Sequence, residues 1–378
     1  MNPEIIVDKL ASFKDRACAG PNEKPVLDYL SSLFPENEIV LEKFKTPKNY
    51  LFIVHWLILG LVFGLLLTPR FDIFGLLIIS FFGVSAILYF NWYASPVTKF
   101  PPLVESHNLI IKGNKQSKKK VILMAHWDTA PISILYTPSM VGNFRSSLKI
   151  NILLIVLAFC VSLVYWIFPS TILVWLSRAL VVYFLGQLVV ASWDFYKFGY
   201  SNGASDNATG VGAAIATAQK LWKENLPNLE IELVLTGAEE VGMIGAKAYY
   251  DNRIGTWNAD TMLINFDTLG AGNLKIITET GSWGNIVYDN ELIQIAKEVI
   301  SKDEALGHVK LGAWHTADFD SVWFQRAGVQ SVTLGALDQN GRMPNIHRET
   351  DVLENVNSKP VHDAVEVAFA MVKKLANS

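Results

Sequence analysis

Five residues of the types that bind metal ions are spread along the 378-residue sequence. His126, Glu240 and Asp267 each follow a short apolar run that is typical of a buried strand. Asp206 begins a segment typical of a helix, and His347 lies near the end of the sequence. Imidazole nitrogens and carboxylate oxygens together suit divalent metals such as zinc. Two metal ions need one bridging carboxylate, which Asp206 can supply, so the set predicts a metal centre.

Each of these residues, taken alone, also has a purely structural interpretation. A histidine at a strand end is more often an ordinary loop residue, and Asp206 alone is typical of a helix N-cap. The adjacent pair Glu239 and Glu240 is typical of acidic residues at a helix start. The joint occurrence favours the metal interpretation, in which one glutamate binds metal and the other faces the bound water. In the same interpretation Asp128 accepts the second ring N–H of His126.

The elements that must position this set alternate between strands and helices. Strands are expected at residues 39–44, 109–113, 120–126, 229–236, 261–267, 274–278 and 329–334. Helices are expected at residues 21–34, 208–223, 240–250, 290–302 and 360–376. This alternation favours an α/β fold with a mixed, mostly parallel sheet flanked by helices. In such sheets ligands bind beyond the carboxyl ends of the strands, where most of the candidate ligands fall.

Four long apolar runs interrupt the alternation. Each has about the 20 residues that a helix needs to cross a bilayer, and tryptophan and tyrosine lie near the ends. Core helices are the alternative, but they rarely run this long without a polar stripe. The runs are residues 50–68, 71–93, 150–168 and 171–193. We therefore expect two inserted transmembrane hairpins, residues 50–93 and 150–193. Arg178 inside the fourth run is either functional or reaches back to the nearby helix end.

The remaining residues form one discontinuous water-facing domain, residues 1–49, 94–149 and 194–378. Hairpins return the chain to the side from which it left, so this whole domain is expected on one side of the membrane. Basic residues gather on that side: Lys43, Lys45, Lys48, Lys99, Arg145, Lys149 and Lys197. Little beyond Arg70 lies on the other side, so the positive-inside rule predicts a cytoplasmic domain. The net charge of −3 gives no indication of a nucleic-acid partner.

The candidate residues closely resemble the pattern of zinc metallopeptidase family twenty-eight. This family includes bacterial leucyl aminopeptidases, glutamate carboxypeptidase and glutaminyl cyclases. Its pattern of His-x-Asp, Asp-Asn-Ala-Ser-Gly, Glu-Glu, Asp and His is matched in order and approximate spacing. The resemblance implies a zinc exopeptidase, phosphorylase/hydrolase-like fold and two zinc ions per chain. It implies that His126 and Asp267 hold one zinc, that Glu240 and His347 hold the other, and that Asp206 bridges them.

The resemblance also implies Glu239 as the catalytic base and Asp128 as the residue that orients the metal-bound imidazole. The sister family of carboxypeptidases and dipeptidases usually has Asp-x-Lys-Gly at the bridging loop, and the loop here has no such lysine. Ser321 stands where family twenty-eight commonly has a histidine, which leaves substrate positioning open. His315 either compensates for that change or is only a loop residue.

The expected function is therefore that of a membrane-integrated, di-zinc exopeptidase of aminopeptidase type. Its substrates would be short or membrane-associated peptides, because the second hairpin leaves just after Asp128 and returns just before Asp206. The expected partners are a peptide substrate and the lipid bilayer, and the sequence does not indicate an oligomeric state. Two alternatives remain: a glutaminyl-cyclase-like acyltransferase that uses one zinc, and a non-catalytic membrane scaffold.

Overall fold

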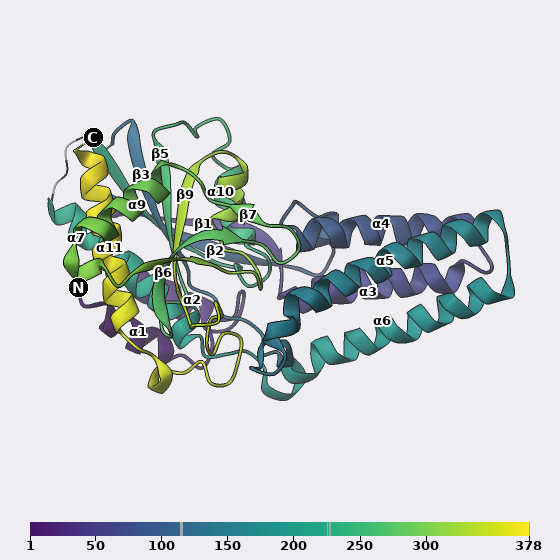
Figure 1. Cartoon of the computed structure of the whole chain (residues 1–378). Helices are drawn as coiled ribbons and strands as arrows, with labels where there is room; N and C mark the ends of the chain where they lie inside the picture. The colour runs from purple at the N-terminus through teal and green to yellow at the C-terminus, as the bar shows by residue number, and fades with distance from the viewer. Residues whose placement is uncertain (114–115, 225, 227, 378) are drawn as a thin grey trace.

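One mixed sheet organises the part of the chain outside the four apolar runs (Figure 1). The structure, a computed structural model, describes residues 1–113, 116–224, 226 and 228–377. Within these residues nine strands form the order β1-β2-β4-β3-β5-β9-β6-β7, with β8 beside β6. The strands are β1 Glu38–Pro47, β2 Leu103–Lys112, β3 Lys119–His126, β4 Leu229–Thr236, β5 Thr261–Asp267, β6 Asn273–Thr280, β7 Ile286–Val287, β8 Lys310–Ala313 and β9 Gln330–Leu337.

The four central strands β4, β3, β5 and β9 run parallel, and antiparallel neighbours flank them on both sides. Helices cover both faces of the sheet. One face carries α1 Pro3–Ala11, α2 Glu23–Ser32, α7 Gly210–Glu224, α9 Glu291–Lys302 and α11 Lys359–Ala376. The other face carries α8 Ile244–Asp251 and α10 Val322–Arg326. The expected α/β class with a mixed, mostly parallel sheet is therefore confirmed.

The alternation of side chains along β3 divides the core between these two layers. Leu123 and Ala125 pack with the helices of the first face, whereas Ile122 and Met124 pack with α8 and α10. All four side chains are fully buried. A strand covered on both faces must be apolar along its whole length, which explains the continuous run before His126.

Most expected elements are present with shifted ends, and β4 and β5 have the expected bounds. The helix expected from residue 240 is wrong at its start, because α8 begins only at Ile244. The preceding residues form a tight turn in which the N–H groups of Gly242 and Met243 both donate to the carbonyl of Glu239. Met243 has a φ of 56°, which ends the turn in a left-handed conformation. Helices α1 and α10 and strands β7 and β8 were not expected.

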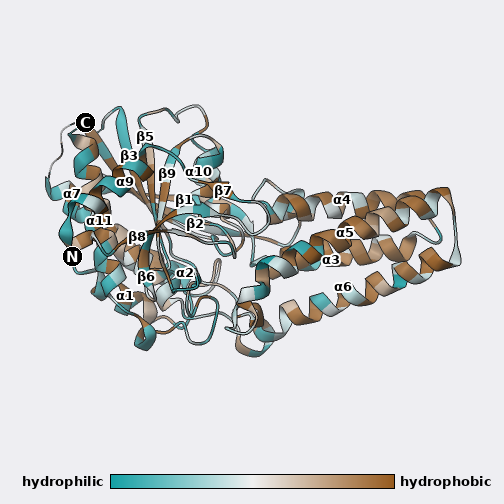
Figure 2. Cartoon of the chain, in the orientation of Figure 1, coloured by the Kyte–Doolittle hydropathy of each residue, from teal (hydrophilic) through white to brown (hydrophobic). Residues whose placement is uncertain are grey.

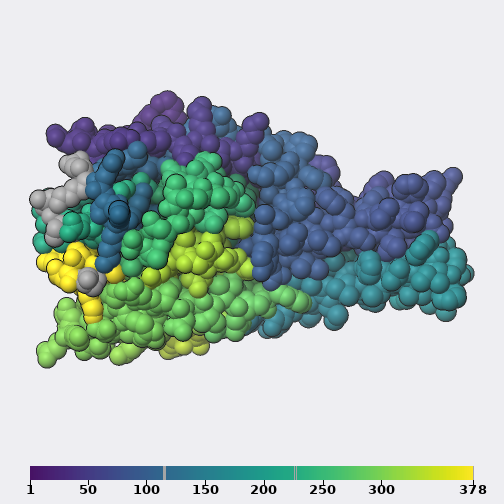
Figure 3. Space-filling view, turned by 90° about the horizontal axis from the view of Figure 1, so that it is seen from above, coloured from purple at the N-terminus to yellow at the C-terminus, as the bar shows by residue number. Residues whose placement is uncertain are grey.

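The four apolar runs form a bundle of helices that projects from one end of the sheet domain (Figures 1 and 3). They are α3 Tyr50–Leu67, α4 Asp72–Phe90, α5 Phe144–Ile167 and α6 Thr171–Phe198. All four are long and apolar enough to cross a membrane, by length and composition alone. Figure 2 shows the bundle as predominantly hydrophobic, with more polar residues at the domain end of α5. Arg178 is exposed on α6, seven residues or about 10 Å after Thr171.

The helix ends differ from the expected runs by up to six residues, and the two largest differences lie next to the sheet domain. Helix α5 begins at Phe144 instead of residue 150, and α6 continues to Phe198 instead of residue 193. The added turns include polar residues that an apolar-run criterion leaves out. They bring both helices of the second hairpin against the loops that follow His126 and precede Asp206, which is where the candidate ligands lie.

Candidate metal centre

Neighbouring parallel strands bring the candidate ligands to one edge of the sheet. Strand β3 ends at His126, and its neighbour β5 ends at Asp267. On the other side of β3, strand β4 leads into the turn that carries Glu239 and Glu240. The loop after β9 adds His347. Because these strands are parallel and adjacent, their carboxyl ends converge, as the strand-end pattern predicted.

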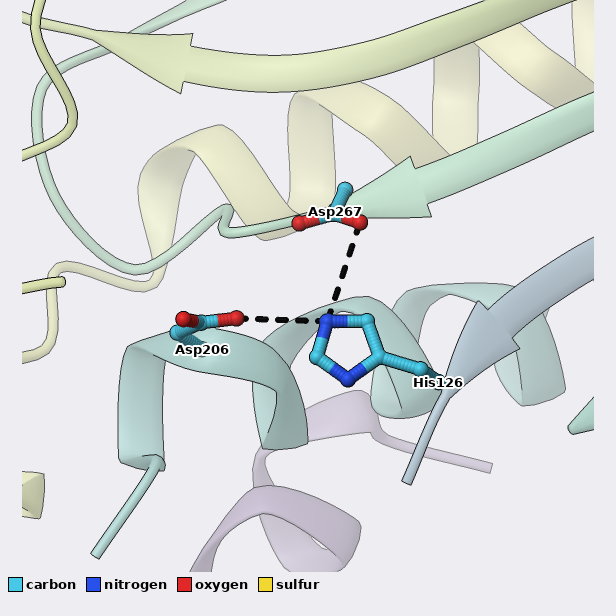
Figure 4. Close-up of side chains that lie close together, drawn as sticks. All are labelled: His126, Asp206 and Asp267. Carbon is cyan, nitrogen blue, oxygen red and sulfur yellow. Dashed lines mark ion pairs between the residues drawn. The ribbon is translucent and has the colours of Figure 1, made fainter. Parts of the chain in front are cut away.

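Asp206 lies between the two histidines. His126 Nε2 is 3.2 Å from Asp206 Oδ1, and His347 Nε2 is 3.3 Å from Asp206 Oδ2. On the first side, Asp267 Oδ2 is 3.7 Å from His126 Nε2, as Figure 4 shows. On the second side, Glu240 Oε2 is 2.9 Å from His347 Nε2. The five residues therefore form two groups of three that share Asp206.

The turn before α7 fixes the position of Asp206. The turn spans Ala204–Thr209, and the peptide between Asp206 and Asn207 is cis. The Asn207 side chain donates to the carbonyl of Phe266 at 2.9 Å, and its Oδ1 accepts the N–H of Thr268 at 3.0 Å. One amide side chain thus joins the Asp206 turn to the end of β5, the strand that delivers Asp267.

Asp128 holds the glutamate turn as well as facing the imidazole. Its Oδ1 accepts the backbone N–H of Glu239 at 3.1 Å, and its Oδ2 accepts that of Glu240 at 3.3 Å. His126 Nδ1 is 3.2 Å from the Asp128 carbonyl oxygen and 3.6 Å from Oδ1. The sequence reasoning expected only the contact with the imidazole. The two backbone contacts need the β3 and β4 ends side by side, which no local pattern shows.

The chemistry of the donor set fits divalent cations. Four carboxylates, of Asp206, Glu239, Glu240 and Asp267, lie around two imidazoles in a site that is almost closed to solvent. If all four were ionised, their negative charge would exceed the positive charge of two protonated imidazoles. Buried charge of one sign is costly unless a counter-charge compensates it. Glu240 Oε1 is in addition buried without a hydrogen-bond partner among the described residues.

Burial and neighbouring charges shift the pKa values of the site. Burial raises the pKa of Glu239, and the nearby Glu240 adds to the effect. Burial opposes ionisation of Asp206 as well, but hydrogen bonds from the two histidines outweigh it and lower the pKa of this carboxyl. Burial by itself lowers an imidazole pKa, yet the surrounding carboxylates raise the pKa values of His126 and His347. Protons therefore compete with metal ions for the imidazoles as the pH falls.

Asp351 holds the backbone of the Asp206 turn. The sequence pattern did not predict this residue. Its carboxylate accepts the N–H of Ser205 at 2.6 Å and that of Asp206 at 3.1 Å. Burial raises the pKa of Asp351 to about 7, and the negative charge of Asp206 contributes. Its position four residues after His347 was the only available signal.

Arg16 is a second residue that the sequence reasoning missed. Its guanidinium is fully buried and donates to the carbonyls of Trp127 at 2.8 Å and Gly203 at 2.7 Å. Burial lowers the pKa of Arg16 to about 10, while Asp351 and other carboxylates oppose that shift. Arg16 thus ties the chain after His126 to the chain before Asp206. More than 100 residues separate it from either contact, so no spacing rule could have found it.

An aromatic ring covers one side of the site. Tyr136, from the short turn Ile134–Tyr136, places its ring centroid 4.3 Å from that of His347. His315 lies away from the ligand groups, and its Nε2 is 3.3 Å from Glu279. Ser321 is buried and hydrogen-bonded to Thr333 at 2.8 Å. Neither His315 nor Ser321 is therefore part of the ligand cluster, whereas Tyr136 contacts it through His347.

Comparisons with known proteins agree with this geometry. The family model described as Peptidase family M28 matches residues 186–372. The aminopeptidase YwaD of Bacillus subtilis is 25% identical over 190 residues, which span 49% of this chain and 40% of that relative. The matched family segment contains four of the predicted ligands, and His126 precedes it.

Solved structures with similar folds include two kinds of enzyme. The glutaminyl cyclase of Porphyromonas gingivalis has a TM-score of 0.60 at 12% identity, covering 99% of this chain and 97% of that one. The LapA aminopeptidase of Legionella pneumophila has a TM-score of 0.57 at 11% identity, covering 100% of this chain and 72% of that one. At these identities the likeness concerns the fold. The match over residues 186–372, with the metal-type cluster at the strand ends, shows that this chain is similar to peptidase family M28.

Proposed function

We propose that this chain is a membrane-integrated, di-zinc exopeptidase of aminopeptidase type, acting on short or membrane-associated peptides. The observation that carries the proposal is the position of Asp206, which has one carboxylate oxygen near each histidine. His126 and Asp267 would hold one zinc, and Glu240 and His347 the other. Asp206 would contribute to both.

The reaction would be amide hydrolysis with Glu239 as the proton carrier. Bound zinc would supply an activated water and polarise the peptide carbonyl. Glu239 takes the proton of the attacking water and later passes it to the leaving amine. Glu239 suits this role because its carboxylate lies beside the candidate ligands, with Oε2 3.9 Å from Nε2 of His126. Asp128 fixes the backbone of Glu239 and so keeps the carboxylate directed at the site.

Charge favours the aminopeptidase mode over the carboxypeptidase mode. The cavity at the site is lined by the carboxylates of the cluster, and no lysine or arginine is among its described lining residues. A substrate α-ammonium would be attracted to Glu239 and Glu240, whereas a C-terminal carboxylate would be repelled and would find no cationic partner. Glutaminyl cyclisation with one zinc is the alternative outcome of the experiment below.

The domain arrangement follows from the bundle. We infer that residues 50–93 and 150–193 are the transmembrane hairpins and that residues 1–49, 94–149 and 194–378 form the peptidase domain. The basic residues near the domain end of the bundle favour a cytoplasmic peptidase domain. Protease added to sealed inside-out vesicles should then digest the domain. Full protection of the domain in those vesicles would contradict this orientation.

The test of the function uses the full-length chain, loaded with zinc in a bilayer, and a panel of aminoacyl, dipeptidyl, carboxy-terminal and N-terminal-glutamine substrates. Glu239→Gln should bind two zinc ions per chain and lose about 100- to 10,000-fold in turnover, as expected for loss of a general base. Glu279→Gln, which changes a glutamate outside the cluster, is the control and should keep both properties. Retained turnover in Glu239→Gln would sink the assignment. One zinc per chain with cyclisation of N-terminal glutamine would favour the cyclase.

A further inference from the structure

The cavity at the metal cluster continues into the helix bundle. It has a volume of about 420 Å³ and is lined by cluster residues at one end and by residues of α3, α4, α5 and α6 at the other. Along α3 the lining runs from Tyr50 to Leu61, and along α5 from Phe144 to Ile155. Eleven residues of helix correspond to about 16 Å. The cavity therefore extends well into the apolar part of the bundle.

The walls of this extension are almost wholly apolar. The residues that line its deeper part are Val54, Leu57, Ile58, Leu61, Ile155 and Phe184. The polar groups lie nearer the sheet domain, where Asn151 accepts a hydrogen bond from Tyr183 at 3.1 Å. Beyond the extension, Leu65, Val161 and Leu180 are buried between the helices. This extension, the bundle cavity, is thus largely apolar and continuous with the metal cluster, and buried side chains lie beyond its deep end.

The same apolar cluster reaches the catalytic turn. Ala238 and Val241, on either side of the glutamate pair, are buried in one cluster with Leu57 and Leu61 of α3. The Tyr89 hydroxyl of α4 donates to the carbonyl of Val241 at 2.9 Å. The bundle therefore packs directly against the turn that holds the proposed base. A side chain of a substrate bound at the metal cluster could therefore extend directly into the bundle cavity.

Size and polarity select the occupant of the bundle cavity. A helical peptide is about 10 Å wide, whereas α3 packs directly against α4 and α6, and α5 against α4 and α6, which leaves no room for a further helix between them. An extended peptide would leave its N–H and C=O groups without partners among aliphatic side chains, which costs several kcal/mol for each group. An alkyl chain is narrow and has no polar group to satisfy. Of these three, only the alkyl chain fits both properties.

We propose that the bundle cavity binds a long alkyl group carried by the N-terminal residue of the substrate. The substrate class is then peptides whose first residue is lipid-like, with a free α-amine at the carboxylates and the alkyl group between α3, α5 and α6. This inference rests on the proposed exopeptidase function. The covalent step is unchanged: water adds across the amide C–N bond and yields the lipid-like amino acid and a shortened peptide.

The test compares dipeptides whose first residue has a methyl, butyl or octyl side chain, each kept below its aggregation concentration. Each methylene buried from water can raise kcat/KM by up to about fourfold. From the methyl to the octyl substrate we therefore expect kcat/KM to rise by about a hundredfold or more. A ratio below about threefold, with the methyl substrate still cleaved, would overturn the inference and leave the proposed function standing. Failure to cleave any of the three would instead count against the proposed function.

Two alanines on α6 provide a matched pair of variants. Ala191 lines the cavity, whereas Ala179 is exposed on the outer side of the helix. Ala191→Phe should bring the octyl-to-methyl ratio towards one, and Ala179→Phe should leave the ratio as in the unmodified chain. Equal ratios in both variants would contradict the assignment of the alkyl group to the bundle cavity.

A second readout does not depend on turnover. A dipeptide with a diazirine at the end of its alkyl side chain is photolysed with zinc-loaded Glu239→Gln in a bilayer, and the adducts are mapped by mass spectrometry. Label on Leu61, Ile155 or Phe184 is expected. Label confined to lipid-facing residues such as Leu153 and Val182, which are 65% and 71% exposed, would show partitioning into the membrane and overturn the proposal.

Discussion

The replacement of Asp128 by asparagine tests whether this residue organises the metal centre. The carboxylate accepts two backbone N–H groups, those of Glu239 and Glu240, and lies 3.6 Å from the ring of His126. Asparagine keeps the shape but has only one oxygen. Its NH₂ group must then face one of the two backbone N–H donors, so one charge-assisted hydrogen bond is lost and a donor is left without an acceptor.

The magnitude follows from that single lost contact. A hydrogen bond to a charged group contributes about 1.5–3 kcal/mol, which corresponds to about 10- to 150-fold in an equilibrium or rate constant. A change of this size agrees with the roughly 10- to 100-fold losses that follow when a residue supporting a metal ligand is altered. We therefore expect Asp128→Asn to lower both the zinc affinity and kcat/KM by such factors.

The assay measures zinc affinity by competition with a chromophoric chelator, kcat/KM on an aminoacyl substrate, and the melting temperature. Asp251→Asn is the control, because Asp251 is an exposed partner of Lys247 and surface pairs of this kind contribute at most about 1 kcal/mol. If Asp128→Asn kept zinc affinity and kcat/KM within about threefold of the unmodified chain, the reasoning about the glutamate turn would be refuted.

Three further predictions concern residues around the site. Burial raises the pKa of Asp318 to about 7, above its unfolded value, so its contribution to stability falls by about 1.4 kcal/mol per pH unit between about pH 4 and pH 7. The melting temperature of Asp318→Asn should therefore rise relative to that of the unmodified chain between about pH 5 and about pH 8, and an unchanged difference in melting temperature would argue against this. Tyr136→Ala should weaken zinc binding severalfold because His347 loses the neighbouring aromatic ring, whereas Tyr136→Phe should not; equal zinc affinities would rule the contact out as support. A methyl group in Gly245→Ala would overlap the carbonyl oxygen of Gly237, so the melting temperature should fall by at least about 3 °C, while Gly186→Ala on the open side of α6 should not lower it; similar melting curves for the two would contradict the close packing.

Local chemistry was enough to predict much of the fold. The buried strands β4 and β5 have the expected bounds because strands covered on both faces must be continuous apolar runs. The four apolar helices followed from run length alone. The helix expected from residue 240 failed at its start because the turn before Ile244 depends on a left-handed Met243, which no apolar periodicity indicates.

The candidate site divides along the same line. The sequence by itself determined the types and order of the candidate ligands, since a residue's ability to bind metal or carry a proton belongs to its own side chain. Only the tertiary structure decided that Asp206 lies between two histidines, and that Arg16, Tyr136 and Asp351 surround the set. It also decided that the cavity enters the bundle. These contacts join segments that are distant in the chain, so they depend on the packing of the whole fold and not on any local pattern.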